Sequence, residues 1–225
     1  MLKALLFDVD GTLAETEEGH RAAWNAAFRS AGLDWNWDQT LYRDLLQTAG
    51  GRERLARFAN GRLSASQTKA IHSEKDRIYR AEARGGGIPL RPGVKELAAE
   101  AGDRGLALAI VTTTSRENAE ALVSGAFGPG GCSLFSVWAC AEDAEVKKPD
   151  PAVYRVALTK LGIAPYEGVA IEDSRNGLLA AHGAGVPVVF TPSLYMDQDD
   201  ASEARLIVRD LAAMTAGDLL DRFGR

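Results

Sequence analysis

The sequence of 225 residues is poor in cysteine and carries no excess of positive charge. Only Cys132 and Cys140 occur, without a Cys-x-x-Cys pair, so the sequence indicates neither a disulfide framework nor a zinc site and favours a reducing compartment. The formal net charge is -5 and the sequence pI is about 5.3, which argues against a general affinity for nucleic acid or anionic membranes. Any anionic ligand must therefore be held locally.

Long apolar runs are also missing. The first apolar stretch, Ala4 to Phe7, ends at Asp8 and is too short for a signal peptide or a membrane span. We therefore expect a cytoplasmic monomer, with neither nucleic acid nor a membrane among its partners. The composition, 46% hydrophobic and 25% charged, is typical of a globular domain with a modest insertion.

Short apolar runs without alternation recur along the chain, and such runs are typical of strands that are buried on both faces. They are Ala4 to Phe7, Ala107 to Val111, Gly168 to Ile171 and Val186 to Phe190, with Ser136 to Ala139 as a weaker fifth. Between them, apolar residues follow helical spacing at 94–101, 119–126 and 153–161. The alternation of strand and helix predicts an α/β fold with a doubly wound parallel sheet.

The stretch 15–88 breaks this rhythm, because it is long and lacks a convincing strand. Apolar residues follow helical spacing from Ala23 to Ala31, and glycine and proline cluster at 85–89, where regular structure should stop. We interpret 15–88 as a helical cap domain inserted into a core made of 1–14 and 89–225. A flexible surface segment is the alternative.

The strongest motif is Phe7-Asp8-Val9-Asp10-Gly11-Thr12-Leu13, directly after the first predicted strand. Open α/β sheets place their functional sites at the carboxyl ends of strands. A period of two in an extended chain puts Asp8 and Asp10 on one side, where two like charges repel unless a cation or a shared proton compensates. The pair therefore predicts chemistry rather than a simple turn.

This motif resembles the Asp-x-Asp-Gly-Thr signature of the haloacid dehalogenase superfamily, and the later motifs of that family follow in order. Thr112 ends the second long strand, Lys148 stands in Lys147-Lys148-Pro149, and Glu172-Asp173 ends a further strand. Two helix starts accompany them. Thr114-Ser115-Arg116-Glu117 predicts a capping box, and Asp150 with Pro151 predicts an N-cap followed by a first helical turn.

The resemblance implies a catalytic mechanism. Asp8 would attack phosphorus to form an aspartyl-phosphate, and Asp10 would protonate the leaving oxygen and then activate water. Thr112, Lys148 and backbone N–H groups near Val9 and Asp10 would stabilise the charge of the transition state.

The resemblance also implies a Mg²⁺ cofactor, since hard oxygen ligands suit that ion. Its ligands would be the side chains of Asp8 and Asp173 and the backbone carbonyl of Asp10. Glu172 would orient water or contribute directly.

The cap region carries a second resemblance, to the CbbY-type phosphatases of the Calvin cycle, whose substrate is xylulose 1,5-bisphosphate, an inhibitor of Rubisco. The strings that support it are Glu15 to His20, Trp35 to Asp38 and Gly50-Gly51-Arg52-Glu53-Arg54, in which arginine replaces the family's lysine at the third position of the last string. The residues that this resemblance assigns to a phosphorylated sugar are Glu17, His20, Tyr42, Gly50, Gly51, Arg52, Glu53, Arg54, Lys75, Thr113, Arg116 and Asn118.

Three alternatives stay open. His20 also matches a position in β-phosphoglucomutase, which returns the phosphoryl group to sugar instead of water. Phosphoglycolate phosphatase is a rival within hydrolysis, disfavoured because the Gly50 to Arg54 string suggests a second phosphate. The remaining alternative is a catalytically silent sugar-phosphate sensor.

Overall fold

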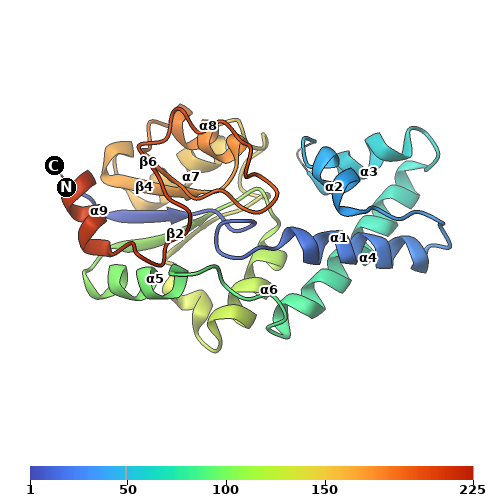
Figure 1. The fold of residues 1–225 in the computed structure, drawn as a ribbon, viewed down its shortest axis with the longest axis horizontal. Coiled ribbons are helices and arrows are strands. Elements are labelled where there is room, and N and C mark those ends of the chain that lie inside the picture. The colour runs from blue at the N-terminus through green and yellow to red at the C-terminus, as the bar shows by residue number, and fades with distance from the viewer. Residues whose placement is uncertain (49, 225) are drawn as a thin grey trace.

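The protein is an open parallel sheet with helices on both faces and a group of helices to one side (Figure 1). The computed structural model describes residues 1–48 and 50–224, and residues 49 and 225 of the expected domain ranges lie outside the described residues. In the described part, six parallel strands follow the order β3-β2-β1-β4-β5-β6. They are β1 (Ala4–Phe7), β2 (Ala107–Val111), β3 (Val137–Ala139), β4 (Gly168–Glu172), β5 (Val188–Phe190) and β6 (Leu206–Ile207). The doubly wound α/β fold predicted from the sequence is confirmed.

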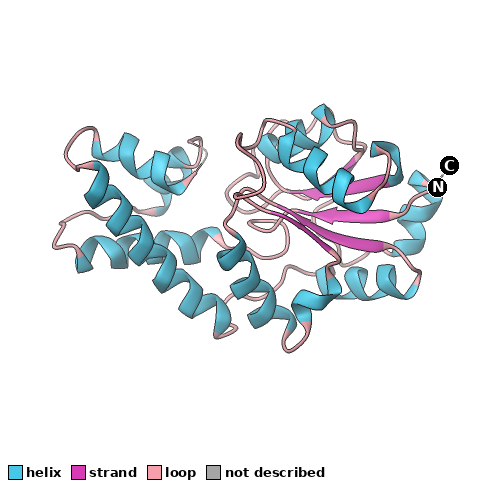
Figure 2. Cartoon of the chain, turned by 180° about the vertical axis from the view of Figure 1, so that it is seen from behind, coloured by secondary structure: helices cyan, strands magenta, loops and turns pink. Residues whose placement is uncertain are grey.

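The central strands β1, β2, β4 and β5 are buried on both faces because helices cover both sides of the sheet (Figure 2). Leu5 and Phe7 point into an apolar cluster with α5 (Val94–Asp103), α6 (Arg116–Phe127) and α9 (Ala216–Phe223), whereas Leu6 points into a cluster with α7 (Ala152–Leu161) and α8 (Arg175–Gly183). Burying each such side chain fully contributes about 1.5–3 kcal/mol. Unalternated apolar runs therefore suit these strands.

The order of the strands creates a switch point beside β1. The chain runs outward from β1 through β2 to β3, then returns to place β4 on the other side of β1. Phe7 is in register with Ile110 of β2 and Ile171 of β4, so the residues that follow these strands meet at one edge of the sheet. Crevices at such points are where open α/β sheets bind ligands.

Four helices lie between β1 and α5 and stand beside that edge of the sheet (Figures 1 and 2). They are α1 (Glu17–Ser30), α2 (Gln39–Leu45), α3 (Gly51–Ala59) and α4 (Ala65–Arg84). Trp24, Phe28, Trp37 and Leu55 give them an apolar cluster of their own. Among the helices of the described residues, none is long and apolar enough to cross a bilayer.

The two chain segments that connect these helices to the sheet lie side by side. Ala14 and Leu90 form an antiparallel bridge, and the buried Arg91 ties both connections to the core. Its guanidinium donates to the backbone carbonyls of Gly11 and Thr191 and lies 3.2 Å from the carboxylate of Glu15. Two short 3₁₀ turns, Gly131–Leu134 and Pro165–Glu167, complete the regular structure of the described residues.

Two expected helix caps are wrong. Ser115 is the N-cap residue of α6 and its side chain makes no capping hydrogen bond, because α6 begins one residue later than a box starting at Thr114 requires. Pro151 is the N-cap residue of α7, and the Asp150 carboxylate instead accepts from the backbone N–H of Ala152 at 2.8 Å.

The strand β5 is also shorter than the run Val186 to Phe190 that the sequence predicted. β5 begins at Val188, because Pro187 has no N–H to donate to the neighbouring strand. The carbonyl of Pro187 still accepts a hydrogen bond from the N–H of Ala170.

Candidate active site

Lys148 is the centre of the charged cluster at the carboxyl edge of the sheet. It is 6% exposed, and its Nζ donates to Asp8 Oδ1 at 2.6 Å, to Glu172 Oε1 at 2.7 Å and to the Val111 carbonyl at 2.9 Å. An ammonium has three protons, so each has an acceptor. Burial alone would lower the pKa of Lys148, but the two carboxylates outweigh burial and raise it. Lys148 therefore stays charged.

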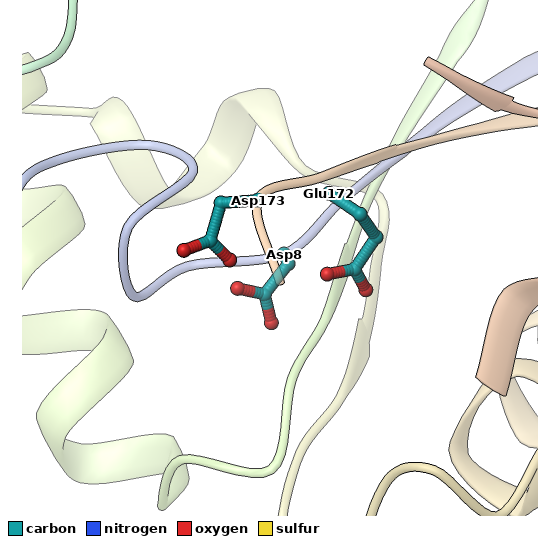
Figure 3. A group of neighbouring side chains, drawn as sticks. All are labelled: Asp8, Glu172 and Asp173. Atoms are coloured by element: carbon teal, nitrogen blue, oxygen red, sulfur yellow. The ribbon is translucent and has the colours of Figure 1, made fainter. Parts of the chain in front are cut away.

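Asp8 and Glu172 contact this cation, and Asp173 lies beside them, with ligand atoms of the three acids within 4.8 Å of one another (Figure 3). Burial raises the pKa of Asp8 despite Lys148, raises that of Glu172 to about 7 and raises that of Asp173 well above its usual range. The neighbouring carboxylates add to each rise. One lysine is therefore too little positive charge for three buried acids.

The cluster suits a hard divalent cation, and two observations support this fit. Glu172 Oε2 is buried and has no hydrogen-bond partner among the described residues. Gly11 has a φ of +78°, and a Cβ there would stand 2.0 Å from Asp173 Oδ2, so the loop is packed against that ligand oxygen. Buried carboxylate oxygens in excess of the local positive charge are what such a cation binds.

Asp10 has a different environment. Its Oδ1 accepts from the Thr16 hydroxyl at 2.6 Å and lies 3.1 Å from His20 Nε2, and its Oδ2 accepts from the Thr114 hydroxyl. Because an ionised carboxylate only accepts, the imidazole carries a proton on Nε2. Burial would raise the pKa of Asp10, but His20 and the two hydroxyls outweigh burial and hold it well below its usual range.

A pocket of about 400 Å³ opens between this edge of the sheet and the four helices. The predicted residues that line it are Asp8, Asp10, Thr112, Thr113, Lys148 and Asp173 of the core, Glu17, His20, Gly50, Gly51, Arg52, Glu53, Arg54 and Lys75 of the helical segment, and Asn118 of α6. The structure thus brings together residues that are far apart in the sequence.

Three predicted residues stand outside this lining. Glu172 lies behind Lys148, where its Oε1 also accepts from the Tyr154 hydroxyl. Tyr42 is fully buried, and its hydroxyl donates to Glu17 at 2.9 Å, so it supports the wall from behind. Arg116 is turned away and donates to the Trp138 carbonyl at 3.2 Å, which corrects its placement among the pocket residues.

Asp76 organises the wall on the side of the helices. Its carboxylate lies 3.2 Å from Lys75 Nζ and 3.3 Å from His72 Nδ1, and it accepts from the Asn118 side chain of α6 at 3.0 Å. Burial lowers the pKa of Lys75, and Asp76 partly offsets this effect. Lys75 is therefore a buried cation on the pocket wall, and Asp76 is its one ion-pair partner in the described part of the chain.

A second ion pair crosses the mouth of the pocket. Lys147 Nζ of the core lies 2.9 Å from Glu53 Oε1 of α3. Arg54, one residue on, donates to the Leu45 carbonyl at 3.1 Å and to the Tyr42 hydroxyl at 3.2 Å. Much of the Arg54 guanidinium is thus already bound by the protein.

Sequence reasoning missed Thr16, Thr114, Tyr154 and Asp76. A hydroxyl three residues after the end of β2, or a tyrosine within a helix, carries no local signal of a contact with a distant acid. Asp76 directly follows the predicted Lys75, and an acid beside a buried lysine is the one signal that the sequence offered.

Comparisons with known proteins show the family of the chain. A family model described as haloacid dehalogenase-like hydrolase matches residues 2–185. Protein CbbY, plasmid, of Cupriavidus necator is 44% identical over 218 residues, which cover 93% of this chain and 86% of that protein.

Many solved structures match the fold, and two of them are crystal structures of CbbY. The crystal structure of CbbY from Rhodobacter sphaeroides in complex with phosphate has a TM-score of 0.92 at 43% identity, covering 97% of this chain and 99% of that one. A mutant of the same protein in complex with xylulose-(1,5)bisphosphate has a TM-score of 0.92 at 42% identity with the same coverage. The chain therefore belongs to the haloacid dehalogenase-like hydrolase family, as the four motifs in its sequence predicted.

Proposed function

We propose that this protein is a Mg²⁺-dependent phosphatase that hydrolyses xylulose 1,5-bisphosphate through an aspartyl-phosphate on Asp8. The observation that carries the proposal is the position of Asp8, which lines the pocket while Lys148 and two further acids surround it. The Rhodobacter sphaeroides relative with bound xylulose bisphosphate supports the choice of substrate. Removal of this Rubisco inhibitor would serve the Calvin cycle, as the sequence resemblance implies.

In the first half of the reaction, a carboxylate oxygen of Asp8 forms a bond to phosphorus while the bond from phosphorus to the sugar oxygen breaks. Asp10 gives its proton to that oxygen, so the sugar leaves as an alcohol. Lys148, Thr112 and the backbone N–H groups of this loop stabilise the charge on the phosphoryl oxygens.

In the second half, water attacks phosphorus and Asp10 takes the proton of that water. The bond between phosphorus and the Asp8 oxygen breaks, which releases phosphate and restores the carboxylate. The helices over the pocket would exclude other water while the sugar is bound.

The side chains of Asp8 and Asp173, with the backbone carbonyl of Asp10, would hold Mg²⁺. When bound, the ion would neutralise negative charge on the phosphoryl group. Glu172 is better placed to orient this cluster, since its Oε1 already accepts from Lys148 and Tyr154.

The second phosphate would bind on the side of the helices. Lys75 is buried on that side. The helix α3 begins at Gly51, and both Gly51 and Arg52 line the same pocket as Lys75. An anion at a helix start is favoured by the free N–H groups and the helix dipole. Arg54 and Asn118 would complete this subsite, with Glu17 and His20 near the sugar hydroxyls.

The test measures phosphate release from mono- and bisphosphorylated pentoses, hexoses and glycolate. We expect Mg²⁺-dependent release that is fastest from xylulose 1,5-bisphosphate and carries solvent oxygen, and that stops in chelator and resumes on adding Mg²⁺. Asp8→Asn should form no acyl-phosphate. Trapped phosphate on another residue, or full activity in chelator, would contradict the mechanism.

A phosphosugar mutase is the alternative function. It is favoured by His20, which matches a position in β-phosphoglucomutase and contacts Asp10. The same preparation is given β-glucose 1-phosphate and a bisphosphate primer. Formation of glucose 6-phosphate faster than free phosphate from any substrate would establish the mutase instead.

A further inference from the structure

Thr114 contacts the side chain of Asp10 from the opposite side to the other donors. Thr16 and His20, which approach Oδ1, lie at the start of the helical segment, whereas Thr114 belongs to the loop after β2 in the core. Its hydroxyl donates to Oδ2 and it lines the pocket. The carboxylate of Asp10 is therefore held between two parts of the chain.

The backbone of Thr114 is itself fixed. Its N–H donates to the Thr112 hydroxyl at 3.2 Å, and its carbonyl accepts from the N–H of Ala141 at 3.0 Å. The hydroxyl therefore reaches Asp10 from a defined position on the core. This matters because the carboxylate can turn about its Cβ–Cγ bond, and donors on both Oδ1 and Oδ2 resist that rotation more strongly than donors on Oδ1 alone.

A hydroxyl suits an acid that gains and loses a proton. It donates to the carboxylate and accepts from the carboxylic acid, so it stays bonded in both halves of the reaction, which an N–H donor cannot do. The proton that leaves Asp10 for the sugar oxygen is replaced by one from the attacking water, and Thr114 exchanges no proton with the substrate.

We propose that Thr114 is a positioning residue, which holds the Asp10 carboxyl group in line with the leaving oxygen. This inference rests on the proposed phosphatase function. It differs from the role proposed for Thr112, which contacts the phosphoryl group. A positioning role acts only through Asp10, and it matters only where the leaving group needs a proton.

The test compares Thr114→Val, which keeps the shape, with Thr114→Ser, which keeps the hydroxyl. The value of kcat/KM is measured for xylulose 1,5-bisphosphate, for glycerol phosphate and for p-nitrophenyl phosphate, whose leaving group departs without a proton. Because kcat/KM covers the steps up to departure of the first product, it reports transfer to Asp8 alone. Thr114→Ala and melting temperatures separate loss of fold from loss of position.

General acid catalysis contributes about 10²–10⁴-fold, so partial misplacement of Asp10 in Thr114→Val should lower kcat/KM for the two alkyl esters by about 10–100-fold. The loss for p-nitrophenyl phosphate should be under about threefold, and Thr114→Ser should restore alkyl ester hydrolysis. In an Asp10→Asn background, Thr114→Val should cause no further loss, because its whole effect passes through the missing acid.

The proposal would be overturned if Thr114→Val lowered kcat/KM equally for all three esters, or if it lowered kcat/KM by the same factor in the Asp10→Asn background as in the wild type. Either result would assign Thr114 to direct contact with the phosphoryl group. Failure of the wild-type protein on the bisphosphate would instead contradict the proposed substrate. In that case glycerol phosphate and p-nitrophenyl phosphate still decide the role of Thr114.

Discussion

Tyr154→Phe removes one oxygen atom from the core of the site. Tyr154 is fully buried on α7, and its hydroxyl donates to Glu172 Oε1, which also accepts from Lys148 at 2.7 Å. The ring lies over Lys148 Nζ at 5.4 Å, and phenylalanine keeps that contact. The substitution therefore isolates a single hydrogen bond to a buried carboxylate.

The expected loss follows from the burial of both partners. A hydrogen bond to a charged group contributes about 1.5–3 kcal/mol, and water cannot replace it at a fully buried Glu172. At about 2–4 °C per kcal/mol for a chain of this size, the melting temperature should fall by about 3–12 °C. Since outer partners orient metal ligands, the affinity for Mg²⁺ should fall by about tenfold.

Urea unfolding in chelator measures the free energy of unfolding, and activity against Mg²⁺ concentration measures the affinity. The matched control is Tyr166→Phe, because Tyr166 is 68% exposed and its change should stay within about 0.5 kcal/mol. If the two variants unfold at the same urea concentration and need the same Mg²⁺, the hydroxyl does not stabilise Glu172 and the reasoning is wrong.

Three further predictions test other parts of the site. Gly11→Ala places a Cβ 2.0 Å from Asp173 Oδ2 at a φ of +78°, so Mg²⁺ titrations of activity should show weaker binding, and unchanged binding would refute the clash. Asp76→Asn should raise KM for xylulose 1,5-bisphosphate by about tenfold with p-nitrophenyl phosphate unaffected, because it loosens Lys75 and Asn118, and equal effects on both esters would contradict it. Burial lowers the pKa of Lys75 in the folded protein. Above that pKa the unfolded chain binds more protons at this lysine than the folded protein does, so the free energy of unfolding increases with rising pH. The free energy of unfolding of wild type minus that of Lys75→Met should therefore increase from pH 7 to pH 10, whereas a constant difference would contradict it.

The sheet and the core motifs were predictable because their signals are local. Buried parallel strands need unalternated apolar runs, and the switch point then fixes where Asp8, Lys148 and Asp173 meet. β6 was missed because two residues, Leu206 and Ile207, form no run. The bounds of α2, α3 and α4 were not predicted, since their apolar residues are few and widely spaced between charged ones.

Contacts made by side chains across the fold could not be predicted. Arg116 is the first residue of α6, and its guanidinium donates to the Trp138 carbonyl instead of lining the pocket, a direction that the local sequence does not reveal. Tyr42 was assigned to the pocket from its place in a string, whereas packing puts it one layer behind Glu17. Sequence resemblance transfers residue identity more safely than side-chain direction.

Asp8 and Asp10 illustrate why position alone does not assign a role. Both open to one pocket from one short loop, as the spacing of two predicted. Asp8 lies among buried acids, and its pKa is raised, whereas Asp10 lies among donors, and its pKa is lowered. The donors come from two distant segments, the start of α1 and the loop after β2. In the proposed mechanism Asp8 must stay ionised, which a divalent cation among the buried acids would favour, while Asp10 exchanges a proton. The different environments of these two acids are therefore made by the tertiary structure around a local motif.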